Sequence, residues 1–186
     1  MRAHAGAKTH ISFEAGVCRK VWRASVPKIQ IHREIAAHAA AEAAGVAPPI
    51  ETVGQVNGAM FITMRRLGRS IAEYAATEPH EAVDAALLEI EDLYRKLDGA
   101  CVLHNNADPR NAVLDECTGR WYLIDFGKAR MREEHDCCSY NTRITFSIMS
   151  VRVGRHDRYA PGTVGRRHPP EVVLRNRGLR AGPHNP

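Results

Sequence analysis

Short apolar segments separated by turn residues occupy the first third of the chain and predict strands around a single helix. Residues 10–24 are expected to be extended, because their apolar residues lie among Arg and Lys between turn-forming positions. From Ile29 a helix is expected, since apolar residues recur every four positions as far as Ala43. Gly45 and a pair of prolines then end this helix.

A hairpin and two further helices are predicted next. Residues 50–56 and 59–64 are expected to be strands around Asn-Gly, the dipeptide most typical of a tight hairpin turn. A short helix is expected over 69–76 and a long one over 79–98, where one face is apolar and Gly99 ends the helix. The apolar face of the long helix consists of Val83, Ala86, Leu87, Ile90, Leu93, Tyr94 and Leu97.

The pattern weakens toward the C-terminus. Residues 112–114 and 121–124 predict two short strands around a Thr-Gly turn. After residue 136 the periodicity fades, and the next segment suits a helix or a strand equally. Residues 151–186 hold many Arg, Gly and Pro and few large apolar residues, so they cannot bury enough surface to offset their ordering entropy. We therefore expect a folded domain over 1–150 and a disordered tail over 151–186.

Length, charge and cysteine usage narrow the class of protein. A chain of 186 residues fits one domain, or one small domain with a tail. The net charge of +5 belongs to the tail, so the rest of the chain is slightly acidic. No apolar run is long enough to span a membrane and the N-terminus lacks the apolar core of a signal peptide, so we expect no membrane association and a cytoplasmic or nuclear location. The five cysteines form no C-x-x-C pair, which favours reduced thiols over zinc ligands or a disulfide framework.

One polar stretch carries the candidate chemistry. Residues 103–115, LHNNADPRNAVLD, precede a predicted strand that ends in Asp-Phe-Gly at 125–127. A strand with Lys20 and a helix with Glu34 lie upstream. This order of elements resembles the protein-kinase-like superfamily over about residues 10–136, most closely its small atypical members of the RIO type.

The resemblance implies an α+β, two-lobe protein-kinase-like fold. Residues 1–64 would form an N-lobe with a small antiparallel sheet, residues 65–68 a hinge, and residues 69–150 a reduced helical C-lobe. It also implies ATP and Mg²⁺ as cofactors, and a hydroxyl group of a protein or of a small molecule as the acceptor of the γ-phosphate.

The same resemblance assigns roles to single residues. Asp125 and Asn111 would ligate Mg²⁺, and Lys20, paired with Glu34, would bind the α- and β-phosphates. Met64 would end the strand that leads to the adenine-binding hinge. Without the resemblance, each of these residues also has a plainer interpretation. Asp125 and Asn111 would be turn residues, Lys20 would be one cation among several on an exposed strand, and Met64 would be part of an ordinary hairpin strand.

The sequence departs from the kinase pattern in the loop that should hold the catalytic base. His104 is expected to brace this loop, and the catalytic Asp should follow at residue 106, where the chain has Asn106. Asp108 is the possible substitute base, although an anion there would repel phosphate. No G-x-G-x-x-G precedes Lys20, so the phosphate lid is either absent or on a strand that this chain lacks.

Three functions compete on these grounds. The first is an ATP-dependent phosphotransferase impaired by Asn106, because an amide can orient an acceptor hydroxyl but cannot remove its proton. The alternative is a pseudokinase that binds nucleotide or a protein partner without turnover. The third is nucleic-acid binding through the arginines of 151–186, where a single tyrosine gives little aromatic interleaving and a solvated basic tail is the simpler interpretation.

Overall fold

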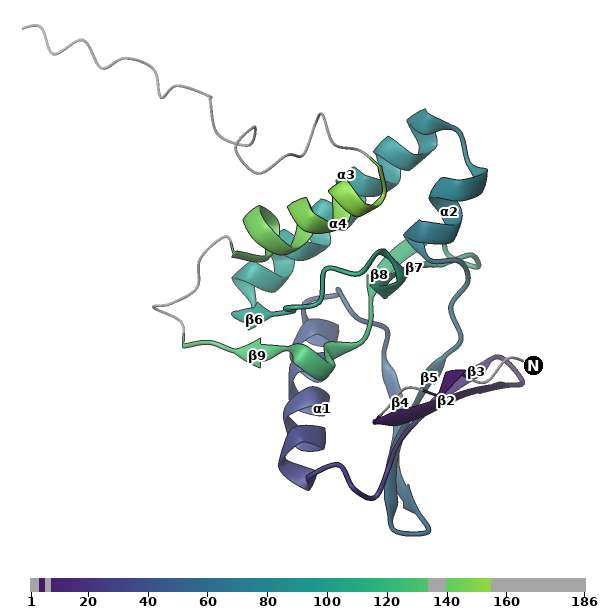
Figure 1. The fold of residues 1–186 in the computed structure, drawn as a ribbon, viewed down its shortest axis with the longest axis vertical. Coiled ribbons are helices and arrows are strands. Elements are labelled where there is room, and N and C mark those ends of the chain that lie inside the picture. The colour runs from purple at the N-terminus through teal and green to yellow at the C-terminus, as the bar shows by residue number, and fades with distance from the viewer. Residues whose placement is uncertain (1–3, 6–7, 134–139, 155–186) are drawn as a thin grey trace, which may run out of the picture.

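The computed structural model describes residues 4–5, 8–133 and 140–154 and shows an α+β protein built on a small antiparallel sheet (Figure 1). The sheet has five strands in the order β1-β2-β3-β5-β4. Its strands are β1 (His4–Ala5), β2 (Thr9–Glu14), β3 (Val17–Trp22), β4 (Ile50–Val56) and β5 (Ala59–Arg65). The α+β class and the small antiparallel sheet are therefore as predicted.

Two tight turns fix the register of this sheet. The predicted Asn-Gly hairpin is confirmed: Asn57 and Gly58 have φ angles of 49° and 79°, as a turn with two left-handed residues requires. The β2–β3 turn uses Ala15 and Gly16 in the same way, with φ angles of 46° and 81°. This register places Lys20 opposite Ile62 in the middle of the sheet.

Helix α1 (Lys28–Ala43) connects the two hydrophobic cores of the protein. Near its start Ile31 packs into a small core with residues of the sheet, and farther along Ala37 and Ala41 enter a larger core made mostly by the other helices. The buried residues of the small core are Trp22, Ile31, Ile62 and Met64. Because α1 belongs to both cores, it holds the sheet and the helical part together.

The helical part contains α2 (Ile71–Thr77), α3 (His80–Gly99) and α4 (Ser147–Arg152). The predicted apolar face of α3 is confirmed, since the seven residues named for it are its buried residues. At the start of α2, Ser70 and Glu73 form a capping box, in which each side chain pairs with the backbone N–H of the other residue. Figure 1 shows α2, α3 and α4 at the end of the molecule opposite the five-stranded sheet.

Two small ladders lie between the sheet and these helices in Figure 1. In one, β6 (Val102–Leu103) pairs with β9 (Arg130–Met131), and in the other β7 (Ala112–Asp115) pairs with β8 (Arg120–Leu123). Single 3₁₀ turns at Pro109–Asn111 and Phe126–Lys128 adjoin the ladders. The ladders bring the loop after β6 close to the end of β8, where the candidate site lies.

The segment after residue 136 that the sequence left undecided is helical where the structure describes it. A π-helical turn covers Asn141–Phe146 and leads directly into α4. Residues 155–186 lie outside the described residues, so the expectation of a disordered tail stays a prediction. No helix within the described ranges is both long and apolar enough to cross a membrane.

The cysteines depart in part from expectation. Cys18 and Cys117 are free thiols, as predicted. Cys101 is disulfide-bonded, so the expectation of reduced thiols is wrong at this residue. Spacing could not reveal this bond, because a disulfide depends on the distance between two cysteines in the fold and not on their separation in sequence.

Candidate functional site

Three of the predicted site residues meet in one charge cluster. The Nζ atom of Lys20 lies 2.5 Å from Oε1 of Glu34 and 3.0 Å from Oδ1 of Asp125. Lys20 comes from the middle of β3, Glu34 from α1, and Asp125 from the turn after β8, 105 positions farther along the chain than Lys20. The fold therefore assembles the Lys20–Glu34–Asp125 cluster from residues that are distant in sequence.

Local backbone geometry allows Asp125 to reach this cluster. Asp125 has φ 62° and ψ 70°, a left-handed conformation that Asp adopts more readily than most residues. Two residues on, an added Cβ on Gly127 would lie 3.4 Å from both Asp125 Oδ1 and Glu34 Oε2. Gly127 therefore lies in direct contact range of both carboxylates, and a larger side chain would have to pack beside them.

Trp22 holds Glu34 in place, a role that the sequence did not predict. Its indole Nε1–H donates to Glu34 Oε2 at 3.0 Å, while Lys20 binds Oε1 of the same carboxylate. Trp22 and Lys20 are two positions apart on β3, so their side chains leave the same face of the sheet. That alternation was visible in the sequence, but the choice of Glu34 as the partner of Trp22 depends on where α1 packs.

The cluster keeps its groups charged. Burial disfavours the ammonium form of Lys20, but attraction by Glu34 and Asp125 outweighs it, and the pKa of Lys20 is raised. Burial likewise acts to raise the pKa of Asp125, yet the charge and hydrogen bond of Lys20 outweigh it, and the pKa of Asp125 is lowered. Both groups are consequently ionised at neutral pH.

The predicted loop residues Asn106 and Asn111 lie next to this cluster. Nδ2 of Asn106 donates to Oδ2 of Asp125 at 3.1 Å, and Oδ1 of Asn106 accepts from Nζ of Lys128 at 3.5 Å. Nδ2 of Asn111 donates to the backbone carbonyl of Asn106 at 3.4 Å, and the backbone carbonyl of Asn111 accepts from the N–H of Ile124 at 2.9 Å. Both asparagines are thereby connected to the turn that carries Asp125.

His104 has the structural role expected of it. Its side chain is fully buried, and Nε2 lies 3.0 Å from the carbonyl oxygen of Ile124. A carbonyl oxygen can only accept, so Nε2 carries the proton. Burial lowers the pKa of His104, and its ring packs against Phe126 with the ring centroids 5.0 Å apart. His104 therefore braces the turn around Asp125 as a neutral side chain.

A buried amide from the far end of the chain holds the start of the same loop. Oδ1 of Asn141 accepts from the backbone N–H of His104 at 2.9 Å, and its Nδ2 donates to the carbonyl of Val102 at 2.7 Å and to Oδ1 of Asp98 at 3.0 Å. The Asp98 carboxylate also accepts from the N–H and hydroxyl of Thr142. Sequence reasoning missed Asn141, because it lies in the segment without periodicity and 37 positions from His104.

Asp108 does not join the cluster in the described structure. Its carboxylate accepts three hydrogen bonds from Arg110, from the backbone N–H at 3.0 Å, from Nε at 2.9 Å and from Nη2 at 2.5 Å. These bonds lower the pKa of Asp108 from its ordinary value of 3.8 to about 2. Such a group is a weak base, and it already pairs with a guanidinium.

Met64, predicted to end the strand that leads to the hinge, lies on the same face of the sheet as Cys18 and Lys20. It is buried near the end of β5 and pairs in register with Cys18, two residues before Lys20 on β3. Burial raises the pKa of the Cys18 thiol, which is consistent with an apolar environment. Met64 belongs to the small hydrophobic core, and Cys18 packs against that core next to Lys20.

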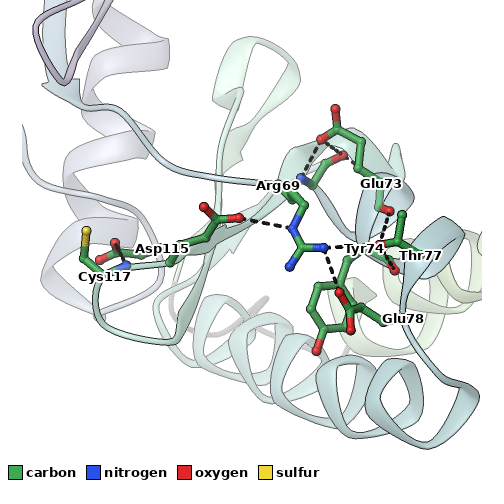
Figure 2. A network of polar contacts seen from close by, with 9 residues as sticks. Arg69, Glu73, Tyr74, Thr77, Glu78, Asp115 and Cys117 are labelled. Carbon is green, nitrogen blue, oxygen red and sulfur yellow. Dashed lines mark hydrogen bonds and ion pairs between the residues drawn. The ribbon is translucent and has the colours of Figure 1, made fainter.

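Ion pairs connect the segment after Met64 to the end of β7 and to the end of α2. Arg65 pairs with Asp115 at the end of β7. Nε of Arg69 lies 3.1 Å from Oε1 of Glu116, and its Nη1 lies 2.8 Å from Oε1 of Glu78. Figure 2 shows the guanidinium of Arg69 next to Glu78 and Thr77, with dashed lines for its bonds to both. These ion pairs therefore fix the conformation of the segment that connects β5 to α2.

The donor set near Asp125 is compatible with Mg²⁺. Within the described ranges, no group of three or more His, Cys, Asp and Glu side chains could hold a metal ion. Mg²⁺ in nucleotide sites, however, is usually bound through one or two carboxylates with the rest of its ligands from phosphates and water. The carboxylate of Asp125 fits that requirement by type, and the side chain of Asn111, whose Nδ2 bonds the carbonyl of Asn106, leaves its amide oxygen without a protein partner within the described ranges.

No protein-family model matches this chain, and the search of curated proteins gives no match. The assignment of a function therefore depends on the residues and their geometry.

Proposed function

We propose that this chain is a Mg-ATP-binding phosphotransferase domain of the protein-kinase-like type, with slow transfer of the γ-phosphate to a hydroxyl of a Ser, a Thr or a small molecule. The observation that carries the proposal is the Lys20 ammonium held between Glu34 and Asp125, at 2.5 Å and 3.0 Å. The small antiparallel sheet, α1 and the separate helical part are consistent with the two-lobe architecture of that superfamily.

The proposed roles follow from the charges in the cluster. Lys20 would bind α- and β-phosphate oxygens, and Glu34, fixed by Trp22, would keep the ammonium in place. Asp125 and Asn111 would hold Mg²⁺, which neutralises charge on the phosphates. The apolar side chains of the small core around Met64 would lie next to the adenine base, with residues 65–68 as the hinge.

Asn106 sets the expected rate. Its amide can accept a hydrogen bond from an acceptor hydroxyl and orient it, but an amide oxygen cannot take up the proton at neutral pH. A positioned general base contributes about 10²–10⁴ in rate. Because positioning and charge stabilisation supply much of phosphoryl transfer, some activity would remain without it.

A pseudokinase is the second candidate, favoured by the bonding of the loop. The Asn106 amide is already bound to Asp125 and Lys128, and the Asp108 carboxylate is bound to Arg110. With both side chains engaged, the chain would bind nucleotide, or a protein partner, without turnover.

Ligand-induced stabilisation tests the proposal directly. A ligand that binds only the folded state at 100 times its dissociation constant stabilises it by about 2.7 kcal/mol. We expect Mg-ATP to raise the melting temperature of the chain, and Asp125→Asn to abolish most of this rise. The control Asp92→Asn, on a carboxylate of α3 that is half exposed, should leave the rise intact. A melting temperature that does not respond to Mg-ATP contradicts the proposal.

Turnover then separates the two candidates. Release of labelled phosphate from Mg-ATP, or transfer to an added protein, supports the phosphotransferase. Nucleotide binding without either supports the pseudokinase.

A further inference from the structure

A cleft of about 1310 Å³ opens beside the charge cluster, between α1 and the segment that follows Asp125. It shares Glu34, Phe126 and Gly127 with the surroundings of the cluster. Because the Gly127 Cα carries no side chain next to Glu34 and Asp125, no bulk at this position separates the cleft from the carboxylates. The cleft therefore adjoins the charge cluster on the side of Glu34 and Gly127, and Lys20 and Asp125 are not among the described residues that line it.

The side chains that line this cleft are strongly basic. Lys8, Arg33, Lys128 and Arg130 are all exposed, and none of them forms an ion pair within the described ranges. Among the described lining residues the one carboxylate is Glu34, which already binds Lys20 and Trp22. A concave surface lined by one sign of charge concentrates its potential and attracts ligands of the opposite sign.

The remaining lining favours a peptide over a nucleic acid. Leu103, Met131 and Tyr140 also line the cleft, and the side chains of Met131 and Tyr140 are exposed. Single-stranded nucleic acids are usually held by several aromatic side chains along a basic groove, whereas the exposed lining residues that the structure describes include one tyrosine. A mixture of cations and apolar residues suits a polypeptide with acidic and apolar side chains.

We propose that this basic cleft docks an acidic segment of the protein acceptor, so that Asp and Glu side chains near the acceptor hydroxyl contact Arg33, Arg130, Lys8 and Lys128. The proposal rests on the proposed function for the reaction, but the docking can be measured without nucleotide. It narrows the acceptor from any hydroxyl to a Ser or Thr within an acidic stretch. Docking of this kind holds the hydroxyl near the phosphate and reduces the entropic cost of the encounter.

Fluorescence anisotropy with two labelled peptides tests the docking. One peptide carries Glu residues on both sides of a central Ser, and the other has Gln in place of every Glu. We expect the full chain to bind the Glu peptide more tightly than the Gln peptide, and the difference to shrink as salt is raised. Equal binding of the two peptides, or tighter binding of an oligothymidylate of similar length, overturns the proposal.

Charge removal in the cleft gives the second arm of the test. The double variant Arg33→Gln with Arg130→Gln should weaken binding of the Glu peptide by about tenfold, which corresponds to about 1.4 kcal/mol. The matched control, Arg23→Gln with Arg143→Gln, removes the same charge from exposed residues outside the lining and should change binding less than about twofold. An unchanged affinity in the cleft variant contradicts the docking.

Two readouts keep this outcome separate from the proposed function. The cleft variant should retain the wild-type melting temperature and its rise with Mg-ATP, because Arg33 and Arg130 are exposed and do not contact the charge cluster. Loss of the Mg-ATP response in the wild-type chain would contradict the proposed function while the peptide measurement still stands.

Discussion

The two sides of the candidate site differ in charge, and under the proposed function this difference separates nucleotide binding from proton removal. On the sheet side, Lys20, Glu34 and Asp125 form a connected set of charges that suits phosphate and Mg²⁺. On the loop side, the amide of Asn106 bonds Asp125, and the carboxylate of Asp108 is paired with Arg110, so neither side chain is a free base of the kind that the proposed phosphoryl transfer would use. In the proposed function, the charge cluster would bind the nucleotide while residue 106 would act on the acceptor hydroxyl, so a substitution at 106 should change turnover more than it changes nucleotide binding.

The loop side is nevertheless well ordered by its bonds. His104 is buried against the turn of Asp125, and Asn141 fixes the backbone at the start of the loop. Such a framework would hold a base in position if one were present. The difference between the two sides is thus one of chemistry and not of folding, and a single substitution should be able to reverse it.

Asn106→Asp should give the largest effect. With Mg-ATP present, a carboxylate at this position can accept the acceptor proton, and the rate of phosphoryl transfer should rise by about 10²–10⁴. Without Mg²⁺ the new carboxylate would lie against Oδ2 of Asp125, where the amide now donates at 3.1 Å, and like charges should lower the melting temperature. Rates from labelled ATP and melting curves with and without Mg²⁺ measure both effects.

The neighbouring Asn105→Asp is the matched control for this substitution. Asn105 lies in the same loop with φ 56°, which Asp also tolerates, and its side chain bonds the carbonyl of Lys128 instead of Asp125. It should change neither the rate nor the Mg²⁺ dependence of the melting temperature. Equal behaviour of the two variants would show that residue 106 has no special place in the site.

Lys20→Met should have the next largest effect, on the sheet side. It leaves Glu34, whose side chain is 12% exposed, without its cation, and breaking a buried ion pair costs about 3–5 kcal/mol. We expect a loss near the lower end of this range in urea unfolding, together with loss of the Mg-ATP response. Lys28→Met, at the exposed first residue of α1, should cost less than about 0.5 kcal/mol. Nucleotide binding that survives Lys20→Met would show that the cluster is only structural.

Asn141→Ala should destabilise the loop side by about 2–3 kcal/mol, because it leaves the buried N–H of His104 and the carbonyl of Val102 without their partner. Hydrogen exchange at the amide of His104 should accelerate in step with the lower stability. Thr142→Val removes only a hydroxyl bond to Asp98 and should cost about 1 kcal/mol. An Asn141 variant as stable as the wild type would mean that other contacts hold the loop.

The sequence predicted the parts of the fold that depend on local periodicity. The apolar face of α3 could be identified from its 3.6-residue repeat, and the β4–β5 hairpin from its Asn-Gly turn. The contact between Lys20 and Asp125 was expected because the order of strands and helices resembles that of the protein-kinase-like superfamily, and no local pattern predicted it. These predictions succeeded because each signal lies within a few residues or within a known order of strands and helices.

Contacts between distant segments were beyond such reasoning. The bond from Trp22 to Glu34 depends on the packing of α1, and the bond from Asn141 to His104 joins a helix start to a loop 37 positions away. The basic cleft likewise contains cations from three separate places, which are the residue before β2, helix α1 and the segment after Asp125. A single cation in a sequence gives no sign of which other cations will surround it after folding.

Asp108→Asn should have the smallest effect on stability and on the rate of transfer. It tests whether Asp108 acts as the general base of the proposed reaction. The bonds from Arg110 lower the folded-state pKa of Asp108 to about 2, so its contribution to stability is complete above about pH 4 and is lost as the pH falls toward 2. The Arg110 side chain is 78% exposed, which limits this contribution to below about 1 kcal/mol. Asparagine can still accept the bond from the backbone N–H of Arg110, so the loop should keep its shape.

For the same variant we expect an unchanged rate of phosphoryl transfer at neutral pH, since a carboxylate with a pKa of about 2 and a guanidinium partner is a poor proton acceptor. The difference in unfolding free energy between wild type and Asp108→Asn should narrow between pH 4 and pH 2 in acid titrations. A rate that falls by about 10²-fold or more on this substitution would identify Asp108 as the base. In that case the loop side would be catalytic after all, and the contrast with the sheet side would disappear.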